Sequence, residues 1–405
     1  MALEYSSNLN DSLALELNIN SSASKDYSYN DALINLYEIS NVQEIVKLKE
    51  GWKKLFLNST DVTPFQSWEW NLEKIYKFTT SEKPKIIVGY NKKNELIGLA
   101  PLKLKRYKFT NIKILEFIGT GPSDYLDFLV DQEYKYYFIS SLFNLIKNSG
   151  DWTILNFNNL RESTVNLITS CLPFEINKQD VCPCICLPGS MKKYENVVHK
   201  RELKSIKRQL RKLLPKNRLE YIVKDSSVSL KEDVDIFINL HQKRHNSKGE
   251  RGRFFTETRK ENFHDISKLL YEAGILQIEM LKIDSQIAAI NYILVWNNRK
   301  YNYLSGMNPD FANFKPGKIL IYYMINDAIN KGCNVFDFLQ GAEKYKYFWT
   351  NEEIQLYSAV YSGSTMCLFL WKNVLTLRNR IKRSTLLKRY YKTFCRIFCR
   401  KFSEE

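Results

Sequence analysis

The chain has 405 residues and a formal net charge of +16, with 60 Lys and Arg against 44 Asp and Glu. This length is typical of two or three domains, and 44% hydrophobic residues are too many for a disordered protein. The Gly-rich motifs of dinucleotide-binding and P-loop proteins do not occur in the sequence, nor do the GxSxG and HExxH motifs of hydrolases. No apolar run approaches the roughly 20 residues of a membrane span, and no signal-peptide pattern is present. We therefore expect a cytoplasmic protein with reduced thiols.

Two short segments account for the net positive charge of the chain. Residues 192–218 and 365–405 each hold eleven Lys or Arg and two Glu, a net charge of +9 in each case. Subtracting both from +16 leaves −2 for the rest of the chain. This distribution predicts local contacts with anions, and it argues against nucleic acid as a partner bound along the whole chain.

Both basic segments contain amphipathic helical patterns. Residues 199–214 combine an apolar face with a basic face, which fits a packed helix with a solvated side or a contact with an acidic substrate or RNA. Residues 385–402 place aromatic and aliphatic residues opposite five cations. We expect this second helix either to pack on its own protein or to attach the protein peripherally to the anionic inner face of a membrane.

The same order of elements occurs twice along the chain. A strand hairpin, a third strand, a crossover helix and a fourth strand are predicted at 84–90, 95–105, 113–118, 132–148 and 153–158. The second set is predicted at 275–283, 287–296, 300–305, 316–331 and 335–339. In each set a pair of helices comes before the hairpin. The repetition predicts a mixed α/β (α+β) fold of two tandem domains, each with a largely antiparallel sheet flanked by helices.

The expected domain organisation has four parts. A loosely attached tail covers 1–34, the first domain 35–189, the second domain 190–364 and the basic C-terminal helix 365–405.

Several short motifs appear in order along these two halves. They are Thr63–Trp70, Leu240–Arg244, Gly249–Phe255, Tyr303–Gly306, Pro316–Lys318 and Asp337–Gly341, followed by Tyr345, Lys346, Trp349 and Thr350. Together they resemble the GNAT superfamily of acyltransferases, over roughly residues 40–360, and most of all its CelD/BcsL-type branch, which is associated with cellulose and exopolysaccharide synthesis. The doubled arrangement also resembles the Fem-type aminoacyltransferases, which use aminoacyl-tRNA.

The resemblance implies an N- or O-acyltransferase that uses acetyl-CoA or another acyl-CoA on a sugar or cell-envelope precursor. Of the superfamily's pyrophosphate signature, the aligned Phe314–Ile319 keeps only the central glycine, Gly317. Two alternatives stay open: a Fem-like transferase that uses charged tRNA, and a non-catalytic envelope protein that kept the doubled fold.

A phosphate site is predicted where the chain enters the helix at 316–331. A helix start offers unpaired N–H groups, and Gly317 lets a ligand approach the backbone. The expected donor-binding residues are Ser305, Gly306, Lys315, Gly317, Lys318 and Ile319. The first half has Asp124 and Asp127 in place of cations, so we expect no cofactor there and a loop that faces the acceptor.

Acyl transfer needs a base for the acceptor's proton and benefits from an acid for the departing thiolate. His241 or Glu343 is the candidate base and Tyr345 the candidate acid. Two other interpretations stay open: His241 is a hydrogen-bonded histidine of the interior, and Glu343 and Tyr345 belong to a polar surface loop. The candidate acceptor-binding residues are Arg244, Trp70 and Asp124. We expect no metal, because His241 and His245 lack a third ligand nearby in the sequence and Cys182, Cys184 and Cys186 do not have zinc spacing.

Overall fold

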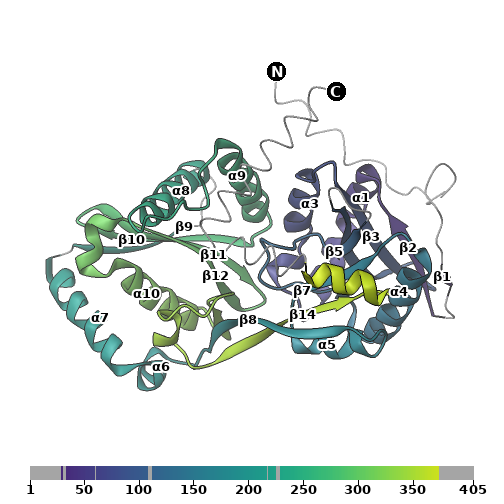
Figure 1. The fold of residues 1–405 in the computed structure, drawn as a ribbon. Helices are drawn as coiled ribbons and strands as arrows, with labels where there is room; N and C mark the ends of the chain where they lie inside the picture. Colours follow the sequence, from purple (N-terminus) through teal and green to yellow (C-terminus); the bar gives the residue numbers. More distant parts are fainter. Residues whose placement is uncertain are drawn as a thin grey trace, which may run out of the picture.

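The computed structural model describes residues 29–30, 33–59, 61–107, 112–216, 218–224 and 229–373. The predicted tail at 1–34 lies mostly outside the described residues. The predicted basic helix at 385–402 lies entirely outside them, so its proposed membrane contact stays a prediction. Within the described part of the chain, the strands form one fourteen-stranded mixed sheet, with helices on both faces (Figure 1).

The first half of the chain builds one end of this sheet. Its strands are β1 (Tyr29–Asn30), β2 (Ile34–Ile39), β3 (Glu82–Asn91), β4 (Leu96–Arg106), β5 (Lys113–Phe117), β6 (Leu129–Val130) and β7 (Ile154–Leu160). Strands β3, β4 and β5 are antiparallel neighbours, whereas β5 and β7 are parallel. The parallel pair is joined by the crossover helix α4 (Lys135–Ser149), which ends at Gly150 in a left-handed conformation.

The second half repeats this arrangement at the other end of the sheet. Its strands are β9 (Leu219–Lys224), β10 (Leu276–Ile283), β11 (Gln286–Trp296), β12 (Arg299–Met307) and β13 (Val335–Asp337). Asp284 and Ser285 both have positive φ, as a two-residue hairpin between β10 and β11 requires. Strands β12 and β13 are parallel and are joined by α10 (Pro316–Asn330). The predicted repeat of hairpin, strand, crossover helix and strand is therefore confirmed in both halves.

The two halves exchange their last strands. Strand β8 (Glu175–Cys186) follows the first repeat but pairs with β13, whereas β14 (Glu353–Tyr361) follows the second repeat and pairs with β7. The two exchanged strands also pair with each other, and this joins the halves into one sheet. Strand β14 thus lies in the sheet of the first half, although its residues fall in the range expected for the second domain. Neither β8 nor β14 belongs to the predicted repeat, so the repeat does not reveal this exchange.

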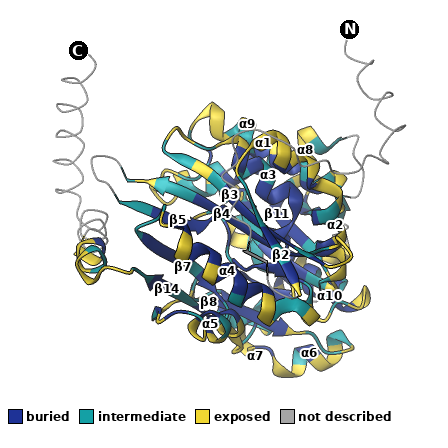
Figure 2. Ribbon diagram, turned by 90° about the vertical axis from the view of Figure 1, so that its right-hand side faces the viewer, coloured by how far each residue is buried: buried dark blue, intermediate teal, exposed yellow. Residues whose placement is uncertain are grey.

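Helices cover the sheet in two layers. Besides α4 and α10, these layers contain α1 (Val42–Lys47), α2 (Lys49–Asn58), α3 (Trp68–Tyr76), α5 (Glu162–Thr169), α6 (Met191–Val197), α7 (Lys200–Leu213), α8 (Leu230–Asn246) and α9 (Glu257–Glu272). One layer holds α1–α3 of the first half beside α8 and α9 of the second, over one shared hydrophobic core (Figure 1). On the other face, α4 and α5 pack against the first half, and α6, α7 and α10 against the second. The strands are largely buried between these layers (Figure 2).

Candidate active site

Strands β12 and β13 separate part-way along β12. Their pairing covers Arg299–Tyr301 against Val335–Asp337, and β12 then continues to Met307. Among the described strands, β12 has no further partner on that side beyond Tyr301. A split of this kind exposes backbone N–H and C=O groups at the centre of a sheet, where a ligand can pair with them.

The C-terminal part of α8 lies against this split. Nδ1 of His241 is 3.0 Å from the carbonyl oxygen of Ser305. Because a carbonyl oxygen can only accept, Nδ1 carries the hydrogen and Nε2 carries the lone pair. The backbone approach is close as well, since a Cβ at Gly306 would lie 3.0 Å from the backbone nitrogen of His241. Glycine at this position is what allows α8 and β12 to pack.

Burial keeps His241 neutral. Its side chain is 5% exposed, and this burial lowers its pKa to about 4, although the bond to Ser305 opposes the shift. His245, one turn later, contacts Glu250 at 2.6 Å. Within the described residues, no group of three or more His, Cys, Asp or Glu is arranged to hold a metal ion.

The loop after β13 forms the opposite side of the split. The ammonium of Lys346 is buried and donates to the carbonyl oxygens of Leu339, Gln340 and Gly341 at 2.9, 2.8 and 3.0 Å. Glu343 is 58% exposed and pairs with Lys346 at 2.9 Å. Lys346 thus fixes the backbone of this loop, and Glu343 is held beside it.

Tyr345 and Arg244 belong to the same cluster. Burial and the nearby Glu343 carboxylate together raise the pKa of Tyr345 to about 12, against the opposing effect of the Arg244 guanidinium. The phenol therefore keeps its proton at neutral pH. His241 and Arg244 both reach the carbonyl oxygen of Ser305, at 3.0 and 3.5 Å, and Tyr345 lies close enough to Arg244 to feel its charge. Their roles in acyl transfer stay predictions.

The predicted phosphate loop is present, but its cations already have partners. Lys315 adopts a left-handed conformation before α10, and a Cβ at Gly317 would meet nothing within 4 Å. Lys315 Nζ contacts Ser205 Oγ at 2.9 Å, and Lys318 Nζ contacts Glu202 Oε2 at 2.6 Å, both on α7. Ile319 is a core residue, and its N–H donates to the carbonyl of Lys315 at 3.2 Å. The open backbone at Gly317 fits a phosphate group, and Lys318 could bind one after leaving Glu202.

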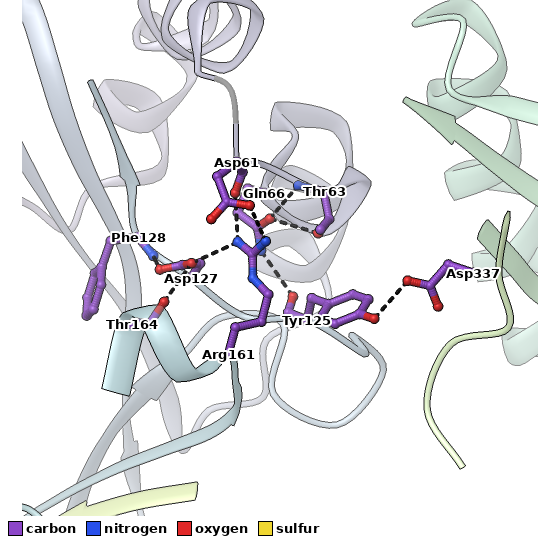
Figure 3. A network of polar contacts seen from close by, with 9 residues as sticks. All are labelled: Asp61, Thr63, Gln66, Tyr125, Asp127, Phe128, Arg161, Thr164 and Asp337. Carbon is purple, nitrogen blue, oxygen red and sulfur yellow. Dashed lines mark hydrogen bonds and ion pairs between the residues drawn. The ribbon is translucent and has the colours of Figure 1, made fainter. Parts of the chain in front are cut away.

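The first half reaches the split through the loop between β5 and α4. Tyr303 of β12 donates to the carbonyl of Pro122 at 3.1 Å, and Tyr125 donates to Asp337 Oδ2 at 2.8 Å. Figure 3 shows Tyr125 extending from the first half toward Asp337, which lies at the end of β13. These contacts place the loop against the second half, and its predicted orientation toward the acceptor stays a prediction.

The base of the loop is anchored within the first half. Arg161 donates to Asp61 and to Asp127, the second at 3.0 Å, and Thr164 donates to Asp127 at 2.8 Å (Figure 3). Gln66 donates to the carbonyl of Tyr125 at 3.0 Å. Asp127 and Gln66 are therefore structural supports of the loop.

Two carboxyl groups near the split have unusual acidity. Burial raises the pKa of Asp337 to about 6, and burial raises that of Asp124 to about 7 against the attraction of Arg253 and Lys346. Asp124, predicted to bind the acceptor, thus lies between cations of the second half. The pKa values of both groups are thus raised toward neutral pH, as is common for carboxyl groups at functional sites.

Trp70, also predicted to bind the acceptor, lines a pocket of about 260 Å³ between α3 and α9. Its indole N–H donates to Ser123 Oγ at 2.8 Å, and its ring makes an edge contact with Tyr303, 5.5 Å between centroids. Arg253 lies at this pocket, with its guanidinium 5.3 Å from the Tyr303 ring centroid. The pocket therefore borders β12 just before Ser305.

Sequence reasoning did not assign site roles to Arg253, Tyr303, Asp337 and Lys346. All four fall inside the motifs that carried the GNAT resemblance, so the motifs were the available signal. The positions of Arg253, Tyr303 and Asp337 depend on contacts between the two halves, which no local pattern encodes, whereas Lys346 bonds within its own loop. No helix among the described residues has the length and apolarity needed to cross a bilayer.

Residues 200–347 match the family model of the acetyltransferase (GNAT) domain. This segment runs from α7 to the loop after β13, and it contains both sides of the split. No curated protein matches the sequence. The match supports a GNAT-type acetyltransferase domain in the second half, whereas the CelD/BcsL-type branch stays a prediction.

Several solved structures share the fold. The crystal structure of FemX has a TM-score of 0.59 at 12% identity and covers 83% of this chain and 99% of its own. The C-terminal domain of a putative lysylphosphatidylglycerol synthetase from Agrobacterium fabrum has a TM-score of 0.53 at 12% identity, with 83% and 97% covered. L-PGS from Bacillus licheniformis has a TM-score of 0.53 at 11% identity, with the same coverage. At these identities the similarity shows the fold alone.

Proposed function

We propose that the protein is an acyl-CoA-dependent N- or O-acyltransferase that acts on a sugar or cell-envelope precursor, with acetyl-CoA as the simplest donor. The observation that carries this proposal is the split between β12 and β13 after Tyr301, within the segment that matches the GNAT domain. His241, Arg244 and Tyr345 surround this split, so an acid and a base are available beside the exposed strand.

The proposed reaction is a single transfer. The acceptor's amine or hydroxyl forms a C–N or C–O bond to the thioester carbonyl carbon, and the C–S bond breaks. His241 Nε2 accepts the proton that the nucleophile loses, since Nδ1–H is committed to Ser305. Tyr345 supplies a proton to the departing sulfur, because its raised pKa keeps the phenol protonated. Glu343 is the less suitable base, since it is exposed and paired with Lys346.

In this proposal the donor's pyrophosphate lies at the start of α10. Gly317 leaves its backbone N–H approachable, and Lys318 contributes charge once it exchanges Glu202 for phosphate. The unpaired length of β12 would then hold the thioester arm by backbone hydrogen bonds. Ser305 and Gly306 are at the point where α8 reaches that strand.

A second candidate is transfer from an aminoacyl-tRNA, as in the Fem-type enzymes that the doubled sequence resembles. Two observations favour it: Lys315 and Lys318 are already engaged by α7, and the fold is similar to that of FemX. This donor would not need the pyrophosphate site, and the exposed cations of α7 would face the tRNA.

Calorimetric titration of the full chain with acetyl-CoA and with charged tRNA separates these candidates. We expect saturable binding of acetyl-CoA that Gly317→Val weakens at least roughly tenfold, because the side chain blocks approach to the backbone. Gly189→Val is the matched control, since a Cβ there also meets nothing within 4 Å. Binding of tRNA without binding of acetyl-CoA would favour the second candidate. Binding of neither would favour the non-catalytic alternative.

A further inference from the structure

The pocket between α3 and α9 has an apolar interior and a basic entrance. Trp70, Phe263 and Tyr292 are buried in its wall, whereas Lys77 and Arg259 are exposed. The aromatic side chains come from both halves of the chain. A volume of about 260 Å³ is enough for a small molecule of monosaccharide size, and aromatic surfaces suit the apolar face of a sugar ring.

Charges around this pocket are not balanced. Its lining holds four cations, Lys74, Lys77, Arg253 and Arg259, against one carboxylate, Glu73. The two lysines have acidic partners, because Lys74 pairs with Glu73, and Lys77 pairs with Asp265 at 3.1 Å.

The two arginines differ from the lysines. Among the described residues, neither Arg253 nor Arg259 has a carboxylate within ion-pair distance. The Arg253 guanidinium lies over the Tyr303 ring. Arg259 donates to the backbone carbonyl of Arg253 at 3.3 Å, and the Arg259 guanidinium lies 4.2 Å from the Phe255 ring centroid. Arg259 is thus bonded to the main chain of Arg253, and both arginines line the same pocket. Their guanidinium N–H groups match the oxygens of a carboxylate or phosphate.

We infer that this pocket binds the acceptor, and that the acceptor carries a carboxylate or phosphate group held by Arg253 and Arg259. This inference rests on the proposed acyltransferase function and adds the chemical class of its acceptor. The apolar face of the molecule packs on Trp70 and Tyr303. Tyr303 precedes Ser305 by two residues on β12, so a molecule seated there lies beside the split where the donor is proposed to bind.

Calorimetric titration of the full chain with glucose 6-phosphate, glucuronate and glucose tests this inference. The first two probes differ in the source of the oxyanion, and glucose is the neutral control. We expect saturable binding of at least one anionic probe and none of glucose. Arg253→Gln and Arg259→Gln should each weaken that binding roughly ten- to hundredfold, as expected for a charge-assisted hydrogen bond.

Arg251→Gln is the matched control, because Arg251 also stacks on Phe255, 3.6 Å from its ring centroid, but does not line the pocket. Arg253→Lys should keep much of the affinity, which separates loss of charge from loss of fold. The inference is overturned if neither anionic probe binds better than glucose, or if Arg251→Gln weakens binding as much as Arg253→Gln. Titrating acetyl-CoA into the same samples assigns a failure to this pocket or to the donor site.

Discussion

His241 is fixed in one orientation by a backbone carbonyl, which determines the nitrogen that can accept a proton. We predict that His241→Gln lowers kcat by about 100-fold, the lower end of general-base effects, while acetyl-CoA still binds. His245→Gln is the control, because His245 lies one turn away and pairs with Glu250. Steady-state kinetics and calorimetry measure both quantities. Equal losses of kcat in the two variants would contradict a role for His241 as base.

Asp337 gives a prediction for stability against pH. Its pKa is about 6 in the folded protein and ordinarily 3.8, so the folded state binds the proton more tightly. The group therefore contributes most below pH 3.8, and this contribution is lost as the pH rises through 6. We expect Asp337→Asn to gain stability relative to the parent between pH 4 and pH 7, measured by urea unfolding. A pH-independent difference between the two proteins would show that the carboxyl titrates normally.

The residues of the site could be predicted only where a motif contained them. His241, Arg244 and Tyr345 were identified from short motifs, and the first two meet at the carbonyl oxygen of Ser305. Lys315 and Lys318 were expected to face phosphate, but contacts with α7 occupy both. Contacts between distant segments determine which side chains are available, and a linear pattern does not contain them.

At the scale of elements, α7 restrains the start of α10. The Lys318 ammonium holds the pKa of Glu202 below its ordinary value, as expected for a direct ion pair. Because partly exposed pairs contribute about 0.2–1 kcal/mol, we predict that Glu202→Gln frees Lys318 and tightens acetyl-CoA binding roughly two- to fivefold. Glu195→Gln is the control, since Glu195 has the same 20% exposure and pairs with Lys207 instead. Weaker binding in Glu202→Gln would place the phosphate elsewhere.

The strands and crossover helices of the two repeats were predictable because each carries its own local signal, whereas β2, β8, β9, β14, α5, α6 and α9 were not predicted. Turn residues marked the hairpins between strands, and Pro316 and Gly332 marked the limits of α10 within two residues. The pairing of β8 with β13 and of β14 with β7 was not predictable, because the buried residues of a strand do not specify which strand pairs with it in the sheet.

At the scale of the whole molecule, the strand exchange makes each half depend on the other. Ala359 of β14 is fully buried in the core of the first half. We predict that Ala359→Asp destabilises the protein by about 3–5 kcal/mol, the cost of an unpaired buried charge, and lowers hydrogen-exchange protection in β7. Ser358→Asp is the control, because its side chain is only half-buried on the neighbouring position of the strand. Unchanged protection of β7 would mean that β14 is dispensable to the first half.

The central claim is that the acyl donor binds at the split of the second half and at the start of α10. Hydrogen exchange of the full chain with and without acetyl-CoA tests this directly, because it locates binding without assuming an acceptor. We predict added protection in peptides that cover 303–306 and 316–320, and none in the corresponding loop of the first half, 118–128. Protection in 118–128 alone, or no added protection anywhere at saturating acetyl-CoA, would contradict the claim.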